Sequence, residues 1–171
     1  RILTRHGIEV VLVRDEQCCG SLTHHMGLDD DALAHARANI DVWTRETERG
    51  GLDAIVITTP AEADIKDYGY LLREDKTYAE KAARVSALAK DVTEYLAGLD
   101  LKWPEQKSGL VVAYHAACSL QHGQKVLAAP KELLSRSGFV VKDVPEGHLC
   151  CGSAGTYNIL QPDLADKLQA R

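Results

Sequence analysis

A single stretch of this sequence occurs twice, and any fold proposed for the chain must accommodate both copies. Residues 7–21 read GIEVVLVRDEQCCGS and residues 138–153 read GFVVKDVPEGHLCCGS, with one residue inserted in the second copy. Each copy contains a helix-ending glycine, an apolar run typical of a β-strand, an acidic turn and the tetrad Cys-Cys-Gly-Ser. A match of this length indicates an internal duplication, so we expect two related lobes.

Strand-like and helix-like segments alternate along the chain. Apolar, β-branched runs predict strands at residues 8–13, 54–58, 110–114 and 139–144. Helical periodicity predicts helices at residues 29–49, 77–99, 130–137 and 162–169. This alternation predicts an α/β fold, in which two related small lobes have parallel sheets flanked by helices. We place the first lobe at residues 1–98, a linker at residues 99–109 and the second lobe at residues 110–171.

Charge and hydropathy narrow the functional classes. The net charge is -5, with acids and bases interspersed, which argues against a basic surface for nucleic acid or anionic lipid. No apolar run approaches the roughly 20 residues that span a bilayer, and no signal peptide is recognisable at the first residues. We therefore expect an interior portion of a larger, cytoplasmic protein.

The five cysteines, Cys18, Cys19, Cys118, Cys150 and Cys151, are the residues best suited to chemistry. An odd number that includes two adjacent pairs fits a disulfide framework poorly, because neighbouring cysteines rarely bridge each other. Thiols kept reduced for metal or redox chemistry are the better interpretation. Functional loops of parallel sheets lie at the carboxyl ends of the strands, which is where the sequence places these cysteines. We predict that Cys118 meets Cys150 and Cys151 at one sheet edge.

The kind of centre stays open at this point. Adjacent cysteines point in different directions, which suits a multi-iron cluster better than tetrahedral zinc, and the chain has no Cys-x-x-Cys pair. Zinc, thiol–disulfide exchange and a docking module with an empty site are the alternatives. His115, His122 and His148 are candidate fourth ligands, whereas a polar loop end explains His24 and His25 more simply.

A cysteine some thirty residues before Cys-Cys-Gly resembles the CCG-type cysteine-rich domain. That domain occurs in heterodisulfide reductase, in lactate-utilisation proteins and in the iron–sulfur subunit of glycolate oxidase. Residues 16–27 and 150–162 look most like the glycolate oxidase protein. The resemblance implies an electron-transfer subunit that passes electrons from a flavin subunit oxidising glycolate toward a quinone. The lactate-utilisation or heterodisulfide reductase role is the alternative within the family.

The resemblance also implies ligands and partners. Cys118, Cys150 and Cys151, with His115 as a further metal ligand, would hold a cluster of the [4Fe–4S] type. Cys18 and Cys19 would be the remnant of a second cofactor site. The implied partners are a flavoprotein subunit and a ferredoxin-like domain outside this chain, with peripheral association at the inner face of the membrane.

Two departures from the family pattern matter. The first copy should have a further cysteine near Thr59, yet residues 59–64 read TPAEAD. Ala117 and Ser119 stand where proline and histidine are common in the family. We therefore expect no cluster in the first copy. The chain alone should hold a cluster, zinc or nothing at the second copy, and it should not catalyse a reaction by itself.

Overall fold

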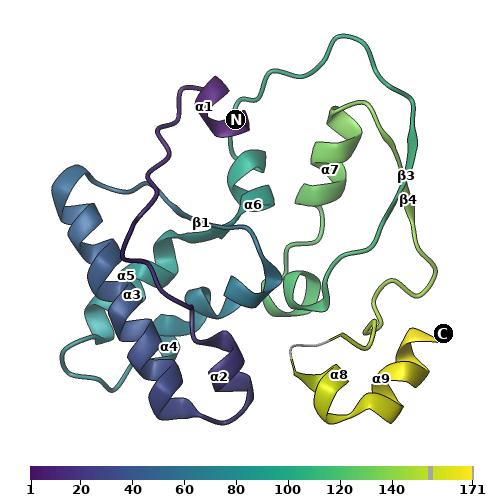
Figure 1. Ribbon diagram of the computed structural model, residues 1–171. Helices are drawn as coiled ribbons and strands as arrows, with labels where there is room; N and C mark the ends of the chain where they lie inside the picture. The colour runs from purple at the N-terminus through teal and green to yellow at the C-terminus, as the bar shows by residue number, and fades with distance from the viewer. Residues whose placement is uncertain (154–155, 171) are drawn as a thin grey trace.

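The computed structural model describes residues 1–153 and 156–170, and contains two separate parallel sheets (Figure 1). Strand β1 (Ile55–Ile57) pairs with β2 (Ala89–Asp91), with Ile55 opposite Ala89. Strand β3 (Val111–Tyr114) pairs with β4 (Val140–Asp143), with Val111 opposite Val140. Each sheet has two strands and helices beside it. The predicted α/β class with two small parallel sheets is confirmed.

The main hydrophobic core lies in the first half of the chain. Helix α3 (Asp29–Gly50) begins with three aspartates, which favour the positive end of the helix dipole. Its buried stripe includes Ala36, Ile40 and Trp43 at helical spacing, as predicted for residues 29–49. The stripe packs on α5 (Ala79–Leu88) and on the segment formed by η1 (Pro60–Asp67) and α4 (Tyr68–Leu71). Figure 1 shows α3 crossing in front of α5 and α4.

The prediction of one helix at residues 77–99 is wrong. The structure has α5, then strand β2, then helix α6 (Val92–Ala97). Asp91 starts α6 with a capping box: its carboxylate accepts from the Thr93 amide, and Glu94 accepts from the Asp91 amide. Pairing with β1 makes residues 89–91 extended, although the apolar residues around them keep a helical period. A tertiary contact therefore overrides the local pattern.

The prediction of a strand at residues 8–13 is also wrong. This segment joins the short helices α1 (Ile2–Arg5) and α2 (Ser21–His25), and no strand of the described residues pairs with it. Leu12 is 87% exposed, and Val13 packs against the core from its edge. Residues 8–13 have the composition of a strand, but a strand also needs a neighbouring strand to hydrogen-bond its backbone N–H and C=O groups.

The second half is built around β3 and β4. Helix α7 (Ala129–Arg136) packs near β4 and beside α6, and the π-helical turn η2 (Ser119–Gly123) follows β3. Two helices end the chain, α8 (Tyr157–Leu160) and α9 (Pro162–Gln169). The predicted strands 110–114 and 139–144 and helices 130–137 and 162–169 are confirmed to within one residue. No helix in the described residues has the length and apolar character needed to cross a membrane.

Candidate functional site

The duplication seen in the sequence extends into the structure beyond the matching stretch. In each copy the Cys-Cys-Gly-Ser turn is followed by a short helix, α2 or α8, and then by α3 or α9. Gly20 and Gly152 both have positive φ, at 81° and 86°. A Cβ on Gly20 would lie 2.9 Å from the Ala32 carbonyl oxygen, and one on Gly152 would lie 2.5 Å from that of Ala165. Glycine is required in both copies, because the backbone of the turn packs directly against the backbone of α3 or α9.

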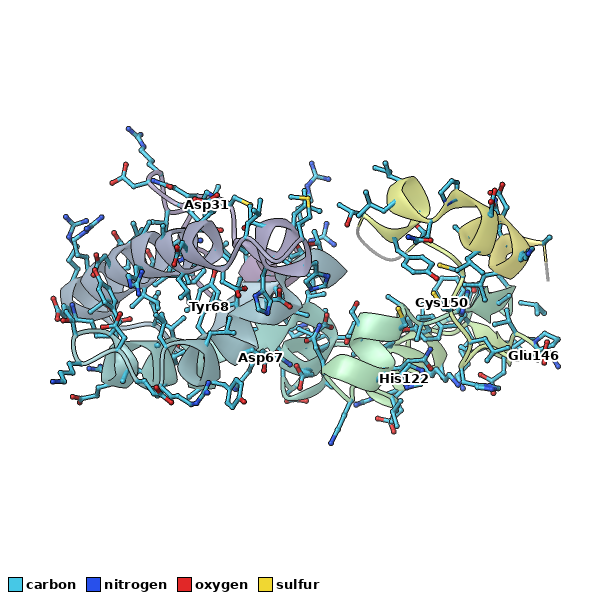
Figure 2. The ribbon with its side chains drawn as sticks, turned by 90° about the horizontal axis from the view of Figure 1, so that it is seen from below. Asp31, Asp67, Tyr68, His122, Glu146 and Cys150 are labelled. Carbon is cyan, nitrogen blue, oxygen red and sulfur yellow. The ribbon has the colours of Figure 1, made fainter. Side chains whose placement is uncertain are left out.

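In the first copy, two buried side chains hold the backbone around Cys18 and Cys19. Asn39, on α3, accepts from the Gln17 amide at 2.8 Å and donates to the carbonyls of Gln17 at 3.2 Å and Cys18 at 3.1 Å. The Tyr68 hydroxyl donates to the Cys19 carbonyl at 2.6 Å. Asn39 and Tyr68 are each 1% exposed, so the turn is fixed to the main core. Figure 2 shows Tyr68 beneath α3.

The Tyr68 hydroxyl is kept in its neutral form. Burial raises the pKa of this phenol well above its ordinary value, and the nearby Cys19, Asp64 and Cys18 add to that increase. The hydrogen bond with Asn39 acts in the opposite direction but is the smaller effect. Tyr68 therefore donates a hydrogen bond throughout the neutral pH range.

In the second copy, hydrogen bonds join the segment after Cys118 to the loop before Cys150. The Gln121 side-chain amide donates to the Gly147 carbonyl at 3.0 Å. The adjacent His122 donates through Nε2 to the His148 carbonyl at 2.9 Å. Figure 2 shows His122 and Cys150 near each other in the right half of the view. The cysteine-bearing segments that follow β3 and β4 are thus tied together at the carboxyl edge of the sheet.

The thiols differ in exposure. Cys19, Cys118 and Cys150 are partly buried, whereas Cys18 and Cys151 are exposed, and all five are free of disulfides. The Gly152 amide donates to Cys150 Sγ at 3.3 Å. His115 is exposed just after β3, and its ring passes near Gly147.

The donor chemistry of these side chains suits an iron–sulfur cluster, because thiols are the usual protein ligands. Among the side chains that the structure describes, however, no three from His, Cys, Asp or Glu gather closely enough to hold a metal ion. The backbone segments are adjacent, but the side chains must turn toward one another to share a centre. The ligand set of Cys118, Cys150, Cys151 and His115 stays a prediction, as does the pair Cys18 and Cys19.

The paired histidines of the first copy face carboxylates. His24 Nδ1 lies 3.2 Å from Asp29 Oδ1, and His25 Nε2 lies 3.4 Å from Asp64 Oδ2. The interpretation of His24 and His25 as a polar loop end stays a prediction.

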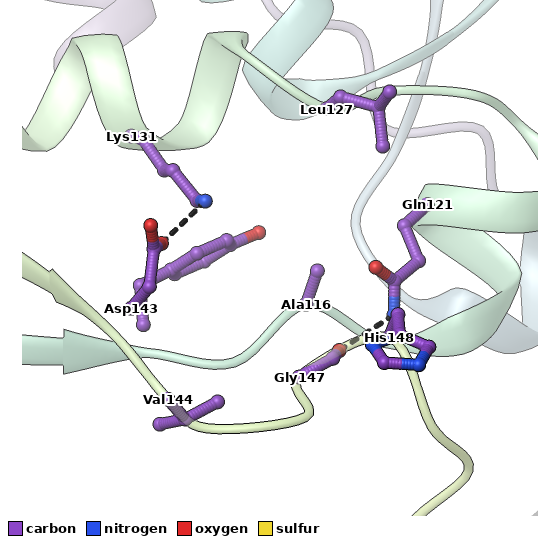
Figure 3. A pocket seen from close by; sticks show the side chains of 9 residues that line it. Ala116, Gln121, Leu127, Lys131, Asp143, Val144, Gly147 and His148 are labelled. Atoms are coloured by element: carbon purple, nitrogen blue, oxygen red, sulfur yellow. Dashed lines mark hydrogen bonds and ion pairs between the residues drawn. The ribbon is translucent and has the colours of Figure 1, made fainter.

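A cavity of about 230 Å³ lies at the carboxyl ends of β3 and β4, next to the hydrogen-bonded cysteine segments (Figure 3). Lys131 Nζ, from α7, pairs with Asp143 Oδ1 at 2.5 Å across one side of it. Burial raises the pKa of the Tyr114 phenol, which lines the same cavity. Sequence reasoning missed this pocket. The sequence feature that could have indicated the pocket is the position of Tyr114 and Asp143 at the ends of two predicted parallel strands. Parallel sheets bind ligands at these strand ends.

Comparisons with known proteins give a consistent result. The family model of the cysteine-rich domain, CCG, matches residues 1–61 and 112–171. The chain is 40% identical over 169 residues to the glycolate oxidase iron-sulfur subunit of Escherichia coli, covering 99% of this chain and 42% of that protein. It is 28% identical over 172 residues to the probable glycolate oxidase iron-sulfur subunit of Bacillus subtilis, covering 98% of this chain and 38% of that protein.

More distant relatives share the same segment. Lactate utilization protein A of Exiguobacterium is 24% identical over 169 residues, which cover 96% of this chain and 66% of that protein. No solved structure matches the chain significantly. The chain spans about two fifths of the length of the two glycolate oxidase relatives.

Proposed function

The chain belongs to the CCG family of cysteine-rich domains, and from this premise we propose that it is an electron-transfer portion of the iron–sulfur subunit of a glycolate oxidase. The similarity to the Escherichia coli and Bacillus subtilis proteins supports this assignment. The observation that carries the proposal is the pair of hydrogen bonds joining the Cys118 segment to the Cys150 segment. These bonds hold the loop that contains Cys118 beside the loop that contains Cys150.

Cys118, Cys150 and Cys151 would hold the cluster, of the [4Fe–4S] type, and His115 would be the fourth ligand. Such a cluster carries one electron at a time between donor and acceptor. The residues of this chain would bind and orient it and would limit its contact with water, since Cys118 and Cys150 are partly buried. The first copy, with two thiols and no third cysteine near Thr59, would hold no cluster.

The partners follow from the same premise. Electrons would arrive from a flavoprotein subunit, pass through clusters that include those of a ferredoxin-like domain, and leave toward a quinone. The two lobes, residues 1–98 and 110–171 with the linker 99–109, would assemble on the cytoplasmic side, peripherally at the membrane.

Metal analysis of protein purified without oxygen tests the proposal. We expect stoichiometric iron and sulfide with broad visible absorption, before or after reconstitution with iron and sulfide. Zinc alone, or no metal after reconstitution, would contradict it and favour a docking module. Rapid formation of a mixed disulfide at Cys118 or Cys150 in a metal-free protein would instead indicate thiol–disulfide exchange.

Lactate utilisation is the second candidate, because lactate utilization protein A of Exiguobacterium matches 96% of this chain. Mixing the iron-loaded protein in turn with the substrate-oxidising component of a glycolate oxidase and with that of a lactate-utilisation system, each with its own substrate, separates the two. Faster reduction of the cluster by the glycolate oxidase component supports the proposal, and faster reduction by the lactate-oxidising component contradicts it.

A further inference from the structure

We propose that Gln121 and His122 are positioning residues of the cysteine site, which lock the Cys118 segment onto the Cys150 segment so that one cluster can bind both. This inference rests on the proposed function and names how the chain prepares that site. Neither residue is a cysteine, and in these contacts each acts on the backbone of the facing loop.

The contact is placed symmetrically between the cysteines. Gln121 follows Cys118 by three residues, and the Gly147 carbonyl that it reaches precedes Cys150 by three residues. The His122 bond adds the neighbouring carbonyl of His148. Two consecutive side chains thus meet two consecutive carbonyls, which fixes both the separation and the direction of the two segments. Figure 3 shows the bond from Gln121 to Gly147 at the edge of the pocket.

The local backbone is shaped for this contact. Residues 119–123 form a π-helical turn, in which the Gln124 amide donates to the Ser119 carbonyl at 2.8 Å. Turns of this type are rare and occur preferentially at functional sites. On the facing loop, Glu146 has a φ of 53°, which is uncommon for a residue other than glycine. Both sides therefore use unusual backbone at the point where they meet.

The bond from His122 also determines the role of its ring. A carbonyl oxygen only accepts, so Nε2 of His122 carries the proton in this contact and Nδ1 is the other ring nitrogen. His122 thereby supports the facing loop through Nε2, and its place among the candidate fourth ligands stays a prediction. Removing such a support typically lowers metal affinity about 10–100-fold without removing a ligand.

Four variants of the full chain test the inference: Gln121→Leu, His122→Phe, the double variant, and His122→Gln. The first three remove donors, whereas His122→Gln keeps an N–H at a similar position. His24→Phe is the matched control, because it makes the same exchange on a partly exposed histidine of the first copy. Each protein is reconstituted with iron and sulfide without oxygen. Iron affinity is measured by competition with a chelator, the cluster by its visible and paramagnetic resonance spectra, and Tm by circular dichroism.

We expect iron affinity to fall about tenfold in each single removal and further in the double variant, with an altered cluster spectrum. His122→Gln should restore most of the affinity, and His24→Phe should match the unmodified protein. Unchanged affinity and spectrum in the double variant would overturn the inference. A loss of iron affinity that His122→Gln does not restore would also overturn it. The same holds for a loss of affinity that is fully explained by a lower Tm.

A metal-free measurement separates this inference from the proposed function. In a background with Cys18→Ser, Cys19→Ser and Cys151→Ser, a short bismaleimide can join only Cys118 to Cys150. We expect the double variant to crosslink about tenfold more slowly. If the unmodified protein binds no iron, the proposed function fails, and the crosslinking rate alone decides the role of Gln121 and His122. Equal crosslinking rates with and without the double substitution would overturn the positioning role.

Discussion

The two Cys-Cys-Gly turns share one backbone plan but are held by different parts of the molecule. In the first copy, Asn39 and Tyr68 hold the turn from the main core, and both are almost completely buried. In the second copy, Gln121 and His122 hold the loop from the rim of a small sheet, and His122 is exposed. The copy predicted to have lost its cofactor has the firmer frame. The copy predicted to bind has the weaker one.

The hydrophobic core shows the same asymmetry. The buried cluster is made entirely of residues between Ala36 and Ala89. In the second half, Leu110, Val111 and Ile159 are among the exposed apolar residues. A bound cluster would tie the Cys118 segment to the Cys150 segment and add stability where packing supplies little. Metal binding and local folding should therefore be coupled in the second copy but not in the first.

The largest expected difference between the copies is in iron content. We expect Cys150→Ser to remove most of the bound iron, because serine is a poor ligand for a cluster held by three thiolates. Cys18→Ser should leave the iron content unchanged, because the first copy is predicted to hold no cluster. Iron and sulfide analysis of both variants after the same anaerobic reconstitution measures the difference.

Cys118→Ser and Cys19→Ser repeat the comparison with the other partly buried cysteine of the second copy and the partly buried cysteine of the first. A loss of iron in Cys18→Ser or Cys19→Ser equal to that in Cys150→Ser would show that both copies share one centre. The proposed division between an active copy and a remnant would then be wrong.

Equivalent truncations in the two sheets should differ next. Ile57, in β1, is 1% exposed, and Val140, in β4, is 45% exposed. We expect Ile57→Ala to lower the free energy of unfolding by about 3 kcal/mol, through lost burial and a cavity. Val140→Ala should lower it by less than about 1 kcal/mol, because its methyl groups already contact water. Urea unfolding of the metal-free protein, followed by tryptophan fluorescence, provides both values, and equal losses would remove the asymmetry of the core.

The sequence predicts those parts of the fold that depend on local pattern. Helix α3 has acids in its first turn and one apolar stripe, and the strands around Val112 and Val141 are β-branched; all are confirmed. Strand β2 was missed because residues 89–91 are extended only through pairing with β1. Residues 8–13 have the composition of a strand but pair with no strand in the part of the chain that the structure describes.

The site shows the same limit. The duplicated tetrad marks the cysteines in the sequence, and it also marks Gly20 and Gly152 as residues without a side chain. Nothing in the local pattern identifies Asn39, Tyr68 or Gln121 as supports, because each reaches a turn far away along the chain. Contacts of this kind depend on tertiary structure, and a single sequence does not specify them.

The smallest expected difference involves one hydroxyl in each half. Tyr68→Phe removes the bond to the Cys19 carbonyl and should lower the free energy of unfolding by about 1 kcal/mol at pH 7. Tyr114→Phe, in β3, should have a smaller effect, because its phenol is less buried and lies at the pocket. Urea unfolding at pH 7 compares the two variants directly.

Raising the pH sharpens this comparison. The pKa of Tyr68 is raised above its ordinary value of 10.0 in the folded state, so the unfolded chain loses this proton first. The stability that depends on neutral Tyr68 is therefore complete below pH 10. It falls above that pH by up to about 1.4 kcal/mol per pH unit. Tyr68→Phe should flatten the decline between pH 10 and 11, and Tyr114→Phe should flatten it less. If both variants declined as steeply as the unmodified protein, Tyr68 would not be the buried neutral donor that fixes the first turn to the core.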